Sequence, residues 1–141
     1  MGNGISDVLR TLYNYNGGEI TVTLLKGTKH KVNLSNDGEY LYSITGLGKS
    51  NHLKLEWFDK IVKYIVDNGG RVKKGGSRNK NAKVGYENCA YGTLAYYVAT
   101  ECYGKKVGDS SFDPIFMVAA ILDNAGICKN ERGYISINRE V

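Results

Sequence analysis

Apolar residues recur along the chain with two kinds of spacing. Spacings of three and four residues predict helices, and strict alternation of apolar and polar residues predicts strands. The expected helices span residues 5–15, 53–67, 87–103 and 113–124. The expected strands span residues 19–25, 30–34 and 40–44, and a hairpin follows at 127–138. The pattern predicts an α+β fold in which a small antiparallel N-terminal meander packs with a three-helix unit that ends in a β-hairpin.

The expected helix at 113–124 is the most hydrophobic of the four. Residues 115 to 122 are apolar on every side of the helix, which is typical of a helix in the core. Ser111 or Asp113 can accept hydrogen bonds from the first free amides, and Pro114 suits the first turn. Asn124-Ala125-Gly126 supplies the stop. We therefore expect the whole C-terminal part to be built around this helix.

After this helix come a short strand, a polar turn at Asn130-Glu131-Arg132-Gly133 and an alternating strand at 134–138. A helix, a tight stop and a hairpin tipped with Lys129 and Arg132 resemble the end of a winged-helix DNA-binding domain. The resemblance implies three packed helices, of which the third enters the major groove, while the hairpin, or wing, touches the DNA backbone or the minor groove. The third helix has no Arg, Lys, Gln or Asn before Asn124, so we expect backbone contacts and no direct base reading from it.

The positive charge of the chain is concentrated in one span. The net charge is +5, and between Asp67 and Glu87 there is no acidic residue. Residues 71–83 combine glycines, which let a backbone approach phosphates closely, with cations that release counterions on contact. We therefore expect nucleic acid as the partner, with duplex DNA favoured. The expected binding residues are Arg71, Lys73, Lys74, Arg78, Lys80 and Lys83 in this span, and Lys129, Asn130 and Arg132 at the wing.

Length and composition indicate one domain. At 141 residues and 42% hydrophobic content we expect a single domain, residues 1–141, with a helix-and-meander subregion (1–48) and a winged-helix-like subregion (50–141). The longest apolar run is too short to span a bilayer, so we expect a cytoplasmic protein without a membrane partner. It can be a monomer or a homodimer. Three cysteines without C-x-x-C spacing indicate neither a disulfide framework nor a zinc site, and no cofactor is expected.

A second class of function stays open beside nucleic-acid binding. Eleven tyrosines against three phenylalanines suggest many rings with a polar edge, as at protein interfaces. The chain can be a protein-interaction module, or a small inhibitor that docks on a larger nucleic-acid enzyme, for example a phage-type anti-defence protein. The tyrosines expected to be exposed for this purpose are Tyr13, Tyr15, Tyr40, Tyr42, Tyr91 and Tyr96.

Two partial motifs raise the question of catalysis. The segment at 43–50 nearly matches the phosphate-binding pattern G-x-x-x-x-G-K-[ST], but the first glycine is missing. Cys89 lies near an expected helix start, where a thiol pKa is lowered, and His30 or His52 could act as its base. The carboxylates show no metal-nuclease spacing. We therefore predict that the protein is not an enzyme and holds no metal.

Overall fold

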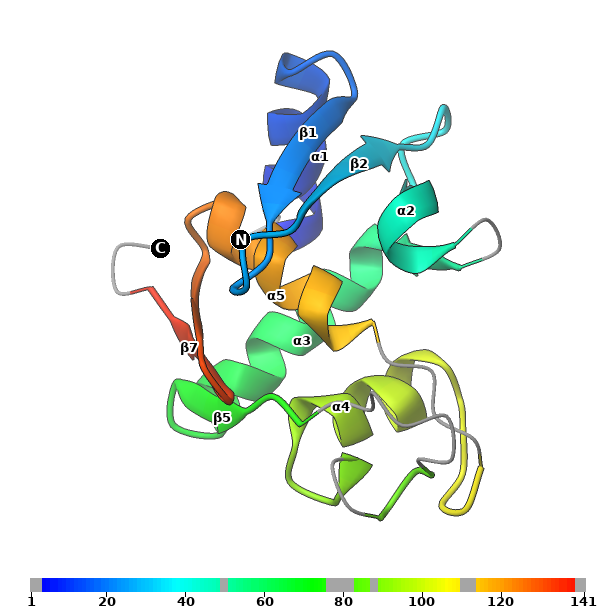
Figure 1. Ribbon diagram of the computed structural model, residues 1–141, viewed down its shortest axis with the longest axis vertical. Helices are drawn as coiled ribbons and strands as arrows, with labels where there is room; N and C mark the ends of the chain where they lie inside the picture. Colours follow the sequence, from blue (N-terminus) through cyan, green and yellow to red (C-terminus); the bar gives the residue numbers. More distant parts are fainter. Residues whose placement is uncertain (1–3, 49–50, 76–82, 87–88, 110–113, 139–141) are drawn as a thin grey trace. The chain divides into compact units, whose positions relative to one another are not determined.

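The computed structural model describes residues 4–48, 51–75, 83–86, 89–109 and 114–138 (Figure 1). The fold is α+β with antiparallel sheets and a C-terminal hairpin, which confirms the expected fold class. By its internal contacts the chain divides into an N-terminal unit, residues 1–63, and a C-terminal unit, residues 64–141. The single domain expected from chain length stays a prediction.

The N-terminal unit contains a four-stranded antiparallel sheet in the order β1-β2-β3-β4. The sheet thus has one strand more than the expected three-stranded meander. Residues 52–54 pair with β3 and do not form the start of the next helix. The expected third strand ends at Tyr42, and Ser43 caps a short helix by accepting a hydrogen bond from the Gly46 amide (3.2 Å). The elements are α1 (Ile5–Tyr15), β1 (Glu19–Thr23), β2 (Lys29–Leu34), β3 (Tyr40–Tyr42), α2 (Ile44–Leu47), β4 (His52–Lys54) and α3 (Leu55–Asp67), which ends in the C-terminal unit.

The two faces of this sheet differ sharply in burial. Side chains alternate between the faces of a strand, and partners in register share a face. One face carries the buried Val22, Val32, Leu41 and Leu53, and α1 contacts β1 and β2. The opposite face is open to solvent and carries the side chains of Lys29, Lys31, Tyr40, Tyr42, His52 and Lys54.

Tyr13 of α1 is buried in the N-terminal unit at 1% exposure. Its hydroxyl has no hydrogen-bond partner among the described residues, and burial raises its pKa. A buried polar group without a partner retains its desolvation cost, so we expect Tyr13→Phe to raise the free energy of unfolding by about 1 kcal/mol. Urea unfolding of the variant measures this. Tyr15→Phe is the control, because Tyr15 is 88% exposed and should leave stability unchanged; a destabilised Tyr13→Phe would contradict the prediction.

The C-terminal unit combines helices with a three-stranded antiparallel sheet in the order β5-β7-β6. The expected helix at 87–103 is shorter in the structure, where it runs from Leu94 to Cys102 and its second half is a π-helix. The reason is local: Gly92 has a φ of +95°, and the Thr93 hydroxyl accepts a hydrogen bond from the Tyr96 amide (3.1 Å). The elements are β5 (Arg71–Lys73), α4 (Leu94–Tyr97), η2 (Val98–Cys102), α5 (Ile115–Asn124), β6 (Cys128–Glu131) and β7 (Tyr134–Ile137).

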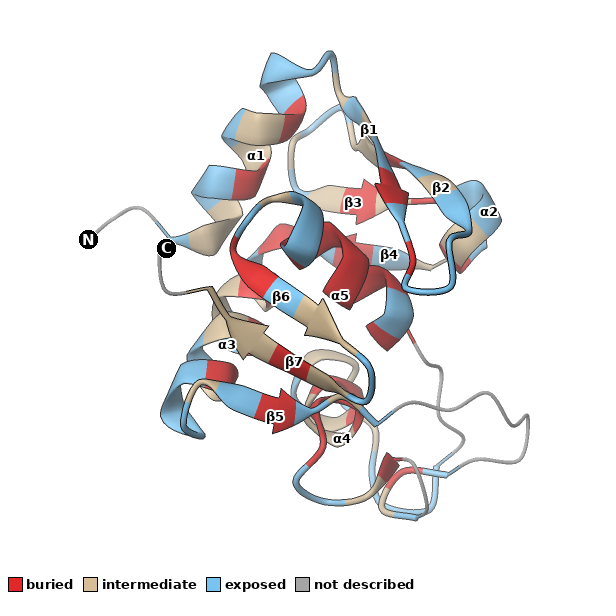
Figure 2. Cartoon of the chain, turned by 60° about the vertical axis from the view of Figure 1, so that its left-hand side comes forward, coloured by how far each residue is buried: buried red, intermediate tan, exposed pale blue. Residues whose placement is uncertain are grey.

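The helix α5 is the core helix that the sequence predicts. Seven of its ten residues are buried, and Figure 2 shows it as the most continuously buried helix of the chain. It begins at Ile115 after Pro114, later than the expected start at Asp113, and no side chain caps it. The proposed caps Ser111 and Asp113 lie outside the described residues. Within the C-terminal unit, α5 contacts β6 and thereby supports the hairpin.

Candidate nucleic-acid interface

The basic span and the C-terminal hairpin meet in one sheet. Residues 71–73 were expected in a loop, but they form β5, which pairs antiparallel with β7 in the register Arg71–Ser136, Val72–Ile135 and Lys73–Tyr134. β7 pairs on its other side with β6, and Figure 2 shows the three strands side by side. Cations that are far apart in sequence are thereby brought to the two outer strands of one sheet.

The sheet has an apolar face and a charged face. Val72, Ile135 and Cys128 are buried on the first, with exposures of 6%, 0% and 2%. The register places Asn130 and Ile137 on this face as well, and it places the other strand residues on the opposite face, which we call the basic face. It consists of Arg71, Lys73, Lys129, Glu131, Tyr134 and Ser136. Three cations against one carboxylate give this face a net positive charge.

The hairpin turn is tighter than the sequence suggests. β6 extends through Glu131, so Asn130 and Glu131 belong to the strand, and the turn consists of Arg132 and Gly133. Gly133 adopts a φ of +79°, which a two-residue hairpin turn favours. The Lys74 amide donates to the Gly133 carbonyl (2.9 Å), which places Lys74 beside the tip. The exposed Arg132 therefore extends the charge of the basic face at this end, whereas Lys74 turns toward Asn130 on the apolar side of the sheet.

Arg71 is held in a small polar network on the basic face. Its guanidinium lies 3.8 Å from the centre of the Tyr134 ring and 3.4 Å from Glu131 Oε1. The Ser136 hydroxyl donates to Glu131 Oε2 (2.7 Å). The hydrogen bond from Ser136 lowers the pKa of Glu131 most, and the hydrogen bond from Arg71 lowers it further. The carboxylate therefore stays charged and offsets the positive charge of Arg71. Arg71 is thus partly neutralised.

Asn130 interacts within the protein. Its side-chain oxygen accepts a hydrogen bond from Lys74 Nζ (2.7 Å), and its backbone N–H donates to Asp123 Oδ2 (2.8 Å). These contacts tie the end of β5 and the end of α5 to β6. Asn130 therefore orients Lys74, and its expected contact with nucleic acid stays a prediction.

Three expected binding residues have side chains with no ion pair or hydrogen bond among the described residues. They are the exposed Lys73, Lys129 and Arg132. Lys129 lies near enough to Glu131 to help lower the pKa of that carboxyl group. Lys83 is exposed as well, in a loop where the Val84 amide donates to the Asp109 carbonyl (2.9 Å). Arg78 and Lys80 lie outside the described residues.

Sequence reasoning overlooked Glu131, Tyr134 and Ser136 as part of this surface. The available signal was the alternation of Arg71, Val72 and Lys73 directly after the Gly69-Gly70 helix stop, which is a short strand pattern. Recognising that strand would have suggested that its polar face continues onto the hairpin.

Among the described residues, the candidate catalytic side chains show no arrangement that supports either catalytic alternative. In the phosphate-loop-like segment Ser43 caps α2, while Lys49 and Ser50 lie outside the described residues. Cys89 is buried at 0% exposure. His30 Nδ1 lies 2.9 Å from Thr45 Oγ1. No group of three or more His, Cys, Asp or Glu side chains in the described ranges could hold a metal ion.

The tyrosines expected at a protein interface differ in exposure. Tyr13 was expected to be exposed, but it lies in the core because its position on α1 faces the sheet side. Tyr15 and Tyr91 are 88% and 85% exposed. Tyr40, Tyr42 and Tyr96 are half-buried.

No described helix has the length and apolar character needed to cross a membrane. Comparison with known protein families, with characterised proteins and with solved structures found no match to this chain.

Proposed function

We propose that this protein binds nucleic acid, preferentially duplex DNA, and that the basic face meets the phosphate backbone. The observation that carries the proposal is the pairing of β5 with β7, which gathers cations from residues 71–74 and 129–132 on one sheet. Lys and Arg side chains that meet phosphates release counterions and bind without reading sequence. A cytoplasmic location is part of the same proposal.

The order of elements supports a winged-helix-like arrangement. Helix α3, strand β5, helix α4 with η2, helix α5 and the hairpin β6–β7 follow one another, and β5 pairs with the last strand of the hairpin. A strand between the first two helices that joins the wing in this way is typical of winged-helix domains. The expected helix start at Leu53 moves to Leu55, since 53 and 54 belong to β4.

The chemistry of the surface favours backbone contacts over base reading. α5, which would enter the major groove in a winged-helix domain, is buried along most of its length. A buried apolar helix offers no donors or acceptors to base edges. The exposed lysines of the sheet and Arg132 at the wing are suited to phosphates, so the proposed binding is mainly independent of sequence.

A protein partner is the second candidate function. The highly exposed Tyr91 lies edge-on to Tyr96 at a centroid distance of 5.4 Å, and exposed tyrosines are enriched at interfaces. A small inhibitor docking on a larger nucleic-acid enzyme would use such a surface. Its binding would respond weakly to changes on the basic face.

Two substitutions with opposite effects test the proposed function. Lys73→Ala removes one phosphate contact, and we expect about fivefold weaker binding of a labelled duplex at moderate salt. Glu131→Gln removes the only carboxylate of the basic face and releases Arg71 from its ion pair, so we expect binding to tighten by about threefold or more. Fluorescence anisotropy titrations measure both affinities.

Each substitution has a control of the same charge change elsewhere in the C-terminal unit. Lys106→Ala and Glu101→Gln alter exposed residues that lie outside the basic face, and both should bind duplex DNA like the wild type. The proposal fails if Lys73→Ala and Glu131→Gln shift the affinity no more than these controls do.

A further inference from the structure

Three rings gather on the open face of the N-terminal sheet, on two neighbouring strands. Tyr42 and His52 are partners in register across β3 and β4, and Tyr40 lies two residues before Tyr42 on the same face. The His52 ring centre lies 5.3 Å from that of Tyr40 and 6.1 Å from that of Tyr42. The rings are tilted by 55° and 53° at distances typical of direct ring contact, so a flat ligand lies over them and not between His52 and either tyrosine.

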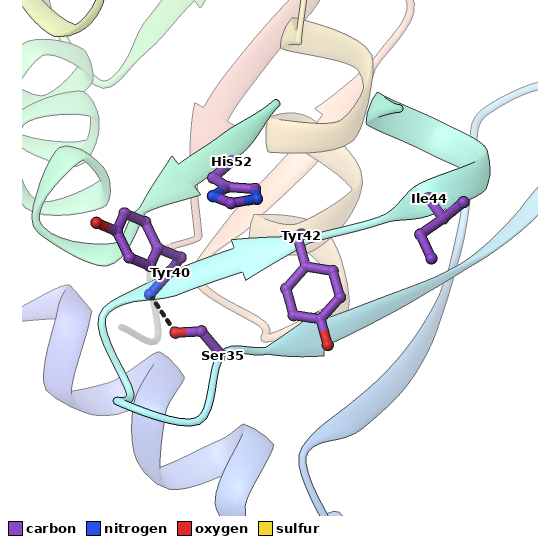
Figure 3. A pocket seen from close by; sticks show the side chains of 5 residues that line it. All are labelled: Ser35, Tyr40, Tyr42, Ile44 and His52. Carbon is purple, nitrogen blue, oxygen red and sulfur yellow. Dashed lines mark hydrogen bonds between the residues drawn. The ribbon is translucent and has the colours of Figure 1, made fainter. Parts of the chain in front are cut away.

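These rings line a hollow, which we call the aromatic hollow. It is lined by Ser35, Tyr40, Tyr42, Ile44 and His52, and has a volume of about 290 Å³ (Figure 3). That volume is at the lower end of the roughly 300–1,000 Å³ found for small-molecule sites. Ile44 is 62% exposed, which is unusual for a large apolar side chain and adds an apolar wall. The space fits one flat ring system better than a bulky ligand.

The polar groups of the hollow differ in what they offer a ligand. The Ser35 hydroxyl is already used, since it donates to Asp37 Oδ1 (2.6 Å) and accepts from the Tyr40 amide (3.0 Å). Tyr40, Tyr42 and His52 form no side-chain hydrogen bond among the described residues. Two phenol hydroxyls and an imidazole are therefore without a partner among the described residues, and Figure 3 shows the Tyr40 hydroxyl pointing away from the rings of Tyr42 and His52.

The charge around the hollow selects the sign of the ligand. Lys29, Lys31 and Lys54 project from the same face of the sheet, where Glu19 is the only carboxylate and lies 4.0 Å from Lys31. Beyond the sheet edge, Asp37 in the β2–β3 turn is engaged by Ser35 and by the Glu39 amide (3.0 Å). Lys54 is the partner of Tyr40 in register, so a cationic ligand, which aromatic cages otherwise suit, would meet like charge beside the hollow. An aromatic ligand attached to an anionic chain complements the surface.

We propose that the aromatic hollow takes an unpaired nucleobase, so that the face of the N-terminal sheet binds a single-stranded segment of nucleic acid. Bases stack on tyrosine and histidine rings exposed on sheets, while flanking lysines meet the phosphates. A base held inside a duplex cannot enter the hollow, so this site is distinct from the basic face, which meets duplex backbone.

The test compares strands that carry the same phosphates with and without bases. A thymidine oligonucleotide of about 12 nucleotides, its uridine ribonucleotide counterpart and an abasic strand of equal length are titrated by anisotropy. The wild type should bind either base-bearing strand about tenfold more tightly than the abasic strand, since one stacked base contributes a factor of this order. The tighter of the two base-bearing strands identifies the sugar.

Variants assign the preference to the hollow. Tyr42→Ala with His52→Ala should abolish the preference for bases, while Tyr42→Phe, which retains the ring, should keep it. His52→Leu is a second test at an exposed position, and it should reduce the preference without disturbing the sheet. Equal wild-type binding of the base-bearing and abasic strands would overturn the proposal, as would an undiminished preference in the double variant. A variant lacking Lys73, Lys129 and Arg132 should keep the preference, which separates failure of this site from failure of the basic face.

Discussion

Raising the salt concentration from about 50 to about 200 mM is expected to weaken the binding of a short DNA duplex by about 40-fold or more. Lys73, Lys129 and Arg132 are exposed, and their side chains form no ion pair or hydrogen bond among the described residues. If each neutralises one phosphate, the logarithm of the affinity falls with a slope of about −2.7 against the logarithm of salt concentration.

The same titration separates the two candidate functions. A tyrosine-rich protein contact has few charges to screen, so its affinity should change little over this range of salt. Duplex binding that changes by less than about twofold over this range would contradict a backbone-binding basic face.

The second large effect concerns the stability of the sheet that carries the basic face. Ile135 lies at the centre of β7, is fully buried and pairs with Val72 on β5 and Asn130 on β6. Ile135→Ala removes buried methyl groups and leaves a cavity, so we expect the free energy of unfolding to fall by about 2–5 kcal/mol. Urea unfolding followed by circular dichroism measures the loss.

Ser136→Ala is the matched control on the neighbouring residue. Ser136 lies on the basic face, and its replacement removes one hydrogen bond to Glu131, with an expected loss of at most about 1 kcal/mol. Hydrogen exchange of the β5 amides should accelerate in Ile135→Ala far more than in this control. Equal destabilisation by both substitutions would contradict the assignment of the inner and outer faces of the sheet.

The long periodic segments of the fold could be predicted from sequence because their signals are local. The apolar run of α5 and the alternation in β1 and β2 are decided by residues close together in the chain. Strands β4 and β5 are three residues each, so alternation gives only a weak signal, and pairing with distant partners establishes them as strands. Leu53 also fitted the apolar spacing of α3, which concealed β4.

The residues of the candidate site could be predicted from the sequence. Their spatial arrangement could be predicted only in part. The concentration of charge at 71–83 and at the wing is visible in the sequence. That Lys73 and Lys129 share one face depends on β7 lying between β5 and β6, which is a tertiary fact. The partial neutralisation of Arg71 by Glu131 depends on the same pairing. Within the N-terminal sheet, the approach of His52 to Tyr40 and Tyr42 likewise depends on β4.

The salt dependence of duplex binding in a triple variant tests the central claim most directly. Lys73→Ala, Lys129→Ala and Arg132→Ala together should reduce the magnitude of the wild-type salt slope by about 2.7. A control that replaces the exposed Lys26, Lys60 and Lys106 by alanine removes the same charge and should keep the wild-type slope. If the triple variant and the control show the same slope as the wild type, the basic face does not meet phosphates.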